Sequence, residues 1–170
     1  PVFEPYDFFD VQTPQSMVVA DFEKNGKPDA VLVDPGLGAF VYINDGTGKF
    51  KESQAVFTTF MISPEFVAAG DVNEDGCPDV LVFDSLGIIR VFPGNCDGTF
   101  QSQSNQIGEG DLTGAATLVD VNGDGHLDLV YSGVWADTIY GQVAGNLLAV
   151  HFGDGKGNFG LAHVYRGGQT

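Results

Sequence analysis

An acidic nine-residue motif occurs three times in the chain, and this repeat constrains the fold more than any other feature of the sequence. The copies read DFEKNGKPD (21–29), DVNEDGCPD (71–79) and DVNGDGHLD (120–128), and their first aspartates are 50 and 49 residues apart. Repeats with periods of about 40–50 residues are typical of four-stranded propeller blades. The spacing therefore predicts three similar structural units that follow one another along the chain.

Short apolar runs flank each motif in the same order. One run precedes the motif and a second follows it; after a third run comes a turn rich in Gly, Asn and Asp that ends in phenylalanine. These segments are 17–20, 30–33, 39–43 and 44–50 in the first copy, 66–69, 80–83, 88–92 and 94–100 in the second, and 116–119, 129–131, 147–152 and 153–159 in the third. Apolar runs without clean alternation indicate strands covered on both faces, whereas Gly and Pro interrupt every window long enough for a helix. We therefore predict an all-β fold in which each copy forms one four-stranded antiparallel blade.

The same register predicts the domain boundaries. Residues 16–65, 66–115 and 116–170 would form the three blades. Residues 1–15 would supply the outer strand of a preceding blade, because 3–11 resembles the segments that follow Phe50 and Phe100. Closed propellers typically have about four to eight blades. The chain is therefore expected to be a partial propeller, completed by further blades of a longer chain or by copies of itself.

The motif D-x-[DEN]-x-[DN]-G-x-x-D, followed by an Asn/Gly…Phe turn, resembles the FG-GAP repeat, also called the VCBS-type repeat. The resemblance covers nearly the whole chain. Such repeats form the propellers of integrin α-chains, of some fungal lectins and of many secreted bacterial proteins. A single loop of this kind would be weak evidence, but three in register with matching flanks are specific.

The resemblance implies one calcium ion (Ca2+) per loop, three in all. Calcium is a hard cation that takes about six to eight oxygen ligands. Motif positions 1, 3, 5 and 9 offer side-chain oxygens, and position 7 offers its backbone carbonyl. The implied ligands are Asp21, Glu23, Asn25, Lys27 and Asp29 in the first loop, Asp71, Asn73, Asp75, Cys77 and Asp79 in the second, and Asp120, Asn122, Asp124, His126 and Asp128 in the third.

The first loop departs most from the family pattern. Glu23 is longer than the usual residue and Asn25 replaces a carboxylate, so we expect weaker calcium binding there. Two other interpretations concern all three loops. They could be plain Asp/Asn/Gly turns of the kind common in hairpins. An EF-hand is disfavoured, because such a loop needs a glutamate at position 12 and the chain has Leu32, Val82 and Tyr131 there.

The formal net charge is −16, with 7 Lys and Arg against 23 Asp and Glu. That sign repels phosphate backbones and anionic lipid surfaces, and no apolar run reaches the ~18 residues that span a bilayer. We therefore expect neither nucleic acid binding nor membrane insertion.

The sequence carries no G-x-S-x-G or H-E-x-x-H motif, so the chain is not expected to be an enzyme. His151 and His163 could face each other and hold a transition metal, but ordinary strand histidines are the favoured interpretation because no third ligand is evident.

The third copy contains an insertion, 133–145, between its second and third strands. It holds the single tryptophan, Trp135, together with Asp137, Tyr140 and Gln142. Binding residues concentrate on loops, and aromatic rings beside hydrogen-bonding groups suit sugars or protein surfaces. These four residues are the predicted ligand site, on a surface loop at the end of the blade opposite the acidic loops. The alternative is that Trp135 only pins the loop to its blade.

Two cysteines lie in turns of the second copy, Cys77 in the acidic loop and Cys96 in the turn before the fourth strand. Both turns emerge at one end of an antiparallel meander, so the two Cα atoms could approach within the ~4.4–6.8 Å that a disulfide requires. The alternative is two free thiols. A disulfide would place the protein in an oxidising, extracellular compartment.

These observations predict an extracellular, calcium-stabilised propeller module for adhesion or for recognition of a glycan or a protein. One alternative is a structural propeller segment that self-associates into a larger scaffold or filament. Another is an enzyme whose chemistry lies elsewhere in a longer chain.

Overall fold

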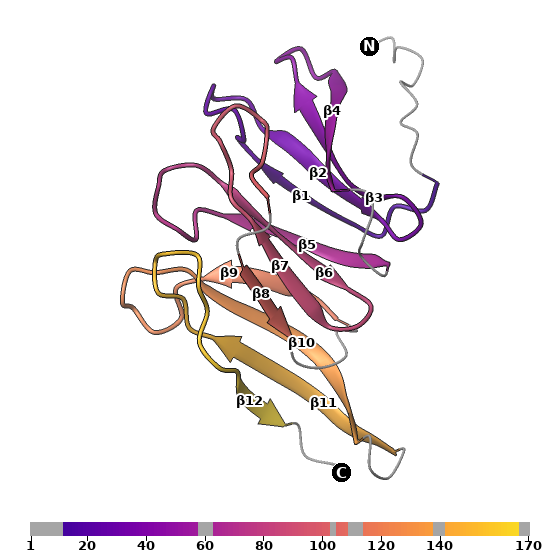
Figure 1. Ribbon diagram of the computed structural model, residues 1–170, viewed down its shortest axis with the longest axis vertical. Coiled ribbons are helices and arrows are strands. Elements are labelled where there is room, and N and C mark those ends of the chain that lie inside the picture. The colour runs from indigo at the N-terminus through magenta and orange to yellow at the C-terminus, as the bar shows by residue number, and fades with distance from the viewer. Residues whose placement is uncertain (1–11, 58–62, 103–104, 109–113, 138–141, 167–170) are drawn as a thin grey trace.

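The computed structural model describes residues 12–57, 63–102, 105–108, 114–137 and 142–166. These residues form three antiparallel sheets of four strands each, and within every sheet the strands lie side by side in chain order (Figure 1). The first sheet contains β1 (Ser16–Ala20), β2 (Asp29–Asp34), β3 (Gly38–Asn44) and β4 (Phe50–Phe57), the second β5 (Pro64–Gly70), β6 (Asp79–Asp84), β7 (Ile88–Phe92) and β8 (Asn105–Gly108), and the third β9 (Ala116–Val119), β10 (Asp128–Asp137), β11 (Gln142–His151) and β12 (His163–Arg166).

Each sheet is one propeller blade, so the predicted fold class is confirmed. β5 begins at Pro64, slightly ahead of the expected boundary at residue 66. The outer strand expected within residues 1–15 falls largely outside the described residues. No helix in the described part of the chain is long and apolar enough to cross a membrane.

Strand β6 shows why the apolar runs do not alternate. All six of its residues are buried, because β6 belongs to a blade that has a neighbour on each face. Val80 and Val82 contribute to the core shared with the first blade, whereas Leu81 and Phe83 contribute to the core shared with the third. Successive side chains of a strand point to opposite faces, so an uninterrupted apolar run supplies both cores.

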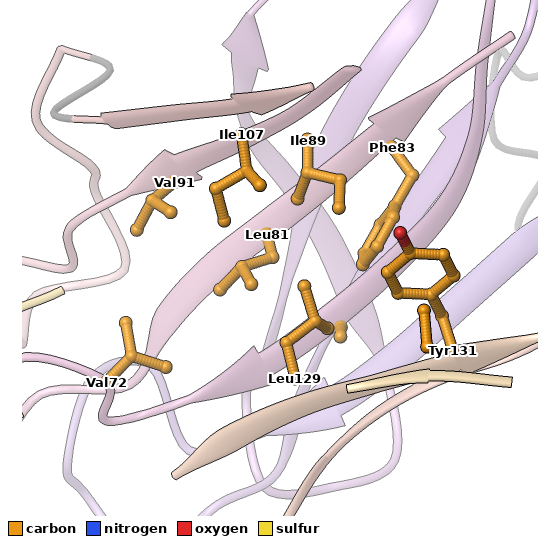
Figure 2. Packing of buried hydrophobic residues seen from close by; sticks show 10 residues of the cluster. Val72, Leu81, Phe83, Ile89, Val91, Ile107, Leu129 and Tyr131 are labelled. Atoms are coloured by element: carbon orange, nitrogen blue, oxygen red, sulfur yellow. The ribbon is translucent and has the colours of Figure 1, made fainter. Parts of the chain in front are cut away.

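Two apolar cores fill the spaces between neighbouring blades. Figure 2 shows the core between the second and third blades, where Leu81 and Phe83 of β6 approach Leu129 and Tyr131 of β10. The buried members of this core are Ala68, Val72, Leu81, Phe83, Ile89, Val91, Ile107, Leu129, Tyr131 and Ala149. Those of the core between the first and second blades are Phe22, Val31, Val33, Ala39, Val41, Val67, Val80, Val82 and Phe92.

The first strand of each sheet is the innermost strand of its blade. β5 contacts both β1 and β9, as expected when blades are arranged around a common axis. The three acidic loops, which join first to second strands, therefore emerge at one end of the blades (Figure 1). The hairpin between β10 and β11 extends toward the opposite end.

Replacing Leu81 with alanine tests the packing between the second and third blades. Leu81 is fully buried, so Leu81→Ala should lower the free energy of unfolding by about 2–5 kcal/mol through lost burial and a residual cavity. The control is Leu86→Ala, because Leu86 is 54% exposed in the β6–β7 turn and its loss should cost less than about 0.5 kcal/mol. Equal effects of the two substitutions in urea unfolding would contradict the described packing.

Candidate calcium loops

The acidic loops share a frame of backbone hydrogen bonds around the position-1 carboxylate. In every loop the two oxygens of this aspartate accept N–H groups from residues further along the same loop. Asp21 accepts from Asn25 (3.0 Å) and Gly26 (2.7 Å), Asp71 from Asp75 (3.1 Å) and Gly76 (2.9 Å), and Asp120 from Gly123 (2.7 Å) and Gly125 (3.0 Å). The carboxylate therefore closes each loop into a tight turn through hydrogen bonds alone, without a metal ion.

Tight closure requires left-handed backbone at positions 4 and 6. Position 6 is glycine in all three loops, with φ of 82°, 90° and 95° at Gly26, Gly76 and Gly125, and only glycine adopts this conformation without a steric cost. Position 4 is also left-handed, with φ of 53° at Lys24 and 59° at Glu74. These residues reverse the chain sharply within each nine-residue loop.

The reversal brings the side chains at positions 3 and 5 together. An asparagine amide donates to a carboxylate across these two positions in every loop: Asn25 to Glu23 (2.7 Å), Asn73 to Asp75 (3.0 Å) and Asn122 to Asp124 (2.8 Å). The first loop carries its asparagine at position 5 and the other two carry it at position 3. Each loop thus offers three carboxylates at its proposed ligand positions, despite the sequence difference noted above.

The position-9 aspartate joins the loop to the rest of its blade. Asp29, Asp79 and Asp128 are fully buried, and each carboxylate accepts two backbone N–H groups. One donor is the residue at position 2 and the other is the residue that opens the turn after the third strand. The donors are Phe22 (3.0 Å) and Asn44 (2.9 Å), Val72 (2.9 Å) and Gly94 (2.9 Å), and Val121 (3.0 Å) and Gly153 (2.9 Å).

Burial raises the pKa of Asp79 to about 6, against an ordinary value of 3.8. The N–H groups of Gly94 and Val72 counteract this shift, while the negative charges of Asp75 and Asp71 reinforce it. Without a cation, the second loop therefore holds a buried carboxylate close to two others at an electrostatic cost. A bound cation would remove that cost.

The donor set of each loop fits a hard cation. It consists of carboxylate, amide and backbone carbonyl oxygens, which calcium prefers. Within the described residues, no three His, Cys, Asp or Glu side chains already converge as a metal cage. Their oxygens accept the N–H bonds described above, and carboxylate oxygens have further lone pairs to offer. To bind calcium, the side chains at positions 3 and 5 would have to exchange their mutual hydrogen bond for the ion.

The side chain at position 7 contacts the turn after the third strand of its own blade. Lys27 donates from its ammonium group to the carbonyl of Asp45 (2.9 Å). Cys77 forms a disulfide with Cys96, and their Cα atoms are 5.0 Å apart. The predicted disulfide is therefore present, and it joins the two turns that the sequence placed at one end of the blade.

The first two loops are covered by the blade that follows them. Gly98 donates its N–H to the carbonyl of Phe22 (3.1 Å), and Gly157 does the same to Val72 (2.9 Å). Phe22 and Val72 are 2% and 3% exposed, whereas Val121 at the same position of the third loop is 50% exposed. Loops 1 and 2 are therefore interblade structures, and loop 3 has no such cover among the described residues.

Side chains also link successive loops. Lys24 donates to the carbonyl of Gly76, and Glu74 pairs with the ring of His126. This contact raises the pKa of His126 above its ordinary value, mainly through its hydrogen bond to Glu74. The sequence did not predict these two contacts between loops, because the residue at position 4 differs from copy to copy. The glycine repeated at the same position of the turn after each third strand (Gly98 and Gly157) was the available signal for the interblade contact.

The predicted ligand residues lie in strands rather than in a loop. Trp135 and Asp137 are in β10 and Gln142 is in β11, while Tyr140 lies outside the described residues. The expectation of a long surface loop was wrong, because the insertion pairs with itself and lengthens the hairpin, with a register shift after Trp135. Its position at the end opposite the acidic loops is as expected; its role in ligand binding stays a prediction.

The two strand histidines do not form a pair. His163 lies opposite Val150 in the β11–β12 ladder, so His151 points to the other face. His151 is buried, with Nδ1 at 2.7 Å from the carbonyl oxygen of Gly160 and its ring stacked on Tyr131. These contacts account for His151 as an ordinary strand residue.

Comparison with known families agrees with the geometry of the loops. The model of the FG-GAP-like repeat matches the chain twice, over residues 21–82 and 71–131. The chain belongs to the FG-GAP-like repeat family. Repeats of this family often bind calcium. The chain is also similar to integrin alpha-7 of Homo sapiens, with 28% identity over 145 residues that cover 72% of this chain. The match spans 12% of that integrin's own length, so this FG-GAP module corresponds to a small part of it.

The raised pKa of Asp79 predicts a pH dependence in the calcium-free protein. The folded-state pKa of about 6 exceeds the ordinary 3.8, so this group stabilises the fold fully below about pH 4 and the contribution is lost as pH rises through about 6. With a chelator present, the free energy of unfolding should fall by up to about 3 kcal/mol across this window. Asp79→Asn is the control, because it cannot ionise and should flatten the profile. A wild-type profile as flat as that of the variant, in urea unfolding, would contradict the shift.

Proposed function

We propose that the chain is a calcium-binding, extracellular β-propeller module that recognises a glycan or a protein ligand and contributes to adhesion. The observation that carries the proposal is the threefold repetition of one loop frame, with oxygen donors at the same positions and the same backbone hydrogen bonds. Turns that served only to reverse the chain would not need three carboxylates each. The integrin-like repeat and the Cys77–Cys96 disulfide support an extracellular location.

Calcium would act as a structural ion in this module. Each loop has three carboxylates at its proposed ligand positions. In the second loop, burial together with the charges of Asp75 and Asp71 raises the pKa of Asp79, which shows that its charged form is disfavoured without a cation. Three bound calcium ions would bring the formal net charge from −16 to about −10, because each ion carries two positive charges. Neutralisation would stiffen the loop end of the blades. We propose no catalytic role for any residue of this chain.

Calcium removal is the direct test of the proposal. Isothermal titration should show three bound ions, and chelation with EDTA should lower the melting temperature. Each site contributes about 2.7 kcal/mol when the free calcium concentration is 100-fold above Kd. Asp71→Asn/Asp75→Asn should reduce the stoichiometry from three ions to two. An unchanged melting temperature in EDTA, with no metal detected by elemental analysis, would reject calcium binding.

The proposed recognition site is the extended β10–β11 hairpin. It carries Trp135, Asp137 and Gln142 at the end of the third blade remote from the acidic loops. Its extra strand length has no counterpart in the first two blades, where β2–β3 and β6–β7 are joined by tight turns. Ligand contacts placed there would not disturb the calcium loops.

A second candidate function is self-association into a scaffold, and the two end faces of the chain favour it. Met17 and Val19 are 61% and 50% exposed on the outer face of the first blade, and Leu148 and Tyr165 are 45% and 59% exposed on the outer face of the third. Neighbouring blades within the chain bury side chains at such faces against each other. The outer faces would pair in the same way if copies, or further blades of a longer chain, met head to tail.

One set of measurements separates the two candidates. Under the recognition proposal, Trp135→Ala abolishes binding to glycan or protein arrays with little change in melting temperature, while the control Leu86→Ala, at the same end of the blades, binds normally. A large loss of stability in Trp135→Ala would instead show that the ring packs against its blade. Under the assembly proposal, sedimentation velocity without ligand shows concentration-dependent association that Val19→Asp suppresses.

A further inference from the structure

The disulfide occupies a place that glycine occupies in the other two blades. Cys96 is the third residue of the turn after the third strand of its blade. The corresponding residues are Gly46 in the first blade and Gly155 in the third. All three are left-handed, with φ of 87° at Gly46, 59° at Cys96 and 65° at Gly155. A side chain with a Cβ disfavours this conformation, and at Cys96 a covalent constraint also acts on the backbone.

The constraint is the bond to Cys77, which lies at position 7 of the second acidic loop. Position 7 contributes its backbone carbonyl to the proposed calcium site. The Sγ atom of Cys96 also lies 3.9 Å from the carbonyl oxygen of Gly76, the preceding residue of that loop. The disulfide therefore fixes the backbone of the second loop next to its proposed ligand oxygen.

The other end of the same turn covers the first loop. Gly98 donates to the carbonyl of Phe22 (3.1 Å), and the ring of Phe100 packs edge-on against the ring of Phe22, with centroids 5.4 Å apart. The Cα of Gly98 is so close to the first loop that an added Cβ would lie 3.3 Å from the Cγ of Glu23. Glu23 is the proposed position-3 ligand. Residues 95–100 thus connect the disulfide directly to the first calcium site.

From this arrangement we propose that the Cys77–Cys96 disulfide is a positioning element for two calcium sites at once. It holds the backbone carbonyl of Cys77 in the second loop, and through the turn 95–100 it holds Phe22 and Glu23 of the first loop. This inference rests on the proposed calcium binding. Its physical basis is preorganisation. A loop that is already in its binding conformation loses less conformational entropy when it binds the ion.

The third loop provides an internal comparison. The turn of the third blade covers the second loop through the same glycine contact, Gly157 to Val72 (2.9 Å). In place of a disulfide, this junction has the noncovalent pair of His126 and Glu74. Within the described part of the chain, no hydrogen bond or disulfide joins the third loop to either cysteine. Its calcium affinity should therefore be independent of the disulfide.

Two double variants test the inference. Cys77→Ser/Cys96→Gly removes the bridge and places at 96 the residue found in the other blades, so the left-handed backbone stays unstrained. Cys77→Ser/Cys96→Ser removes the bridge and keeps the strain. Calcium affinity is measured by titration calorimetry one loop at a time, with the other two loops disabled. Loops 2 and 3 are disabled by Asp→Asn at positions 1 and 5, and loop 1 by Asp21→Asn/Glu23→Gln, because its second carboxylate is at position 3.

Loops 1 and 2 should each bind calcium about tenfold more weakly in both variants, the effect expected if an unbridged loop is in its binding conformation about one time in ten. Loop 3 should keep its wild-type affinity. In calcium-free protein, the Gly98 amide should exchange hydrogen faster in the variants, and the Gly157 amide should not. The exchange rates report positioning without any metal.

Equal affinity of loop 1 with and without the bridge, together with unchanged exchange at Gly98, would overturn the inference. So would an equal weakening of all three loops, because that pattern indicates a general loss of stability. Wild-type protein that binds no calcium would reject the proposed function and this inference with it. Normal calcium binding that ignores the bridge rejects the inference alone.

Discussion

The buried aspartate at position 9 is the interaction on which the rest of each blade depends. Asp29, Asp79 and Asp128 each accept one N–H from the acidic loop and one from the turn after the third strand. A single carboxylate thereby ties both connections at that end of the blade to one point. A buried carboxylate is costly unless it is well hydrogen-bonded or paired, which explains why both oxygens have backbone partners and why a nearby cation would be stabilising.

Blade packing extends this local order along the chain. A strand such as β6 supplies one core with Val80 and Val82 and the other with Leu81 and Phe83, so the blades cannot be assembled independently of one another. At the loop end, the turn of one blade lies on the acidic loop of the blade before it, through Gly98 and Gly157. The acidic loops and the interblade contacts are therefore parts of the same surface.

The repeat carried enough information to predict the sheets, their order, the loop positions and the Cys77–Cys96 bridge, because each depends on spacing along the chain. The hairpin at 133–145 was mispredicted as a loop since its glycines and polar residues hide strand pairing that only the partner strand reveals. The contacts between blades were also missed. They use backbone N–H and carbonyl groups, as between Gly98 and Phe22, and every residue except proline carries such groups. The residues expected to bind calcium lie in the three acidic loops, and their binding of calcium remains a prediction.

The long β10–β11 hairpin has a consequence for how such modules diversify. Its added residues pair with each other beyond the blade, and the register next to the acidic loop, from Leu129 opposite His151 to Gly133 opposite Leu147, is uninterrupted. The hairpin can thus lengthen at one end of the blade without disturbing the strand pairing at the end that carries the acidic loop. Evolution, or an engineer who grafts a foreign epitope, can therefore change the sequence of the hairpin without changing the acidic loops.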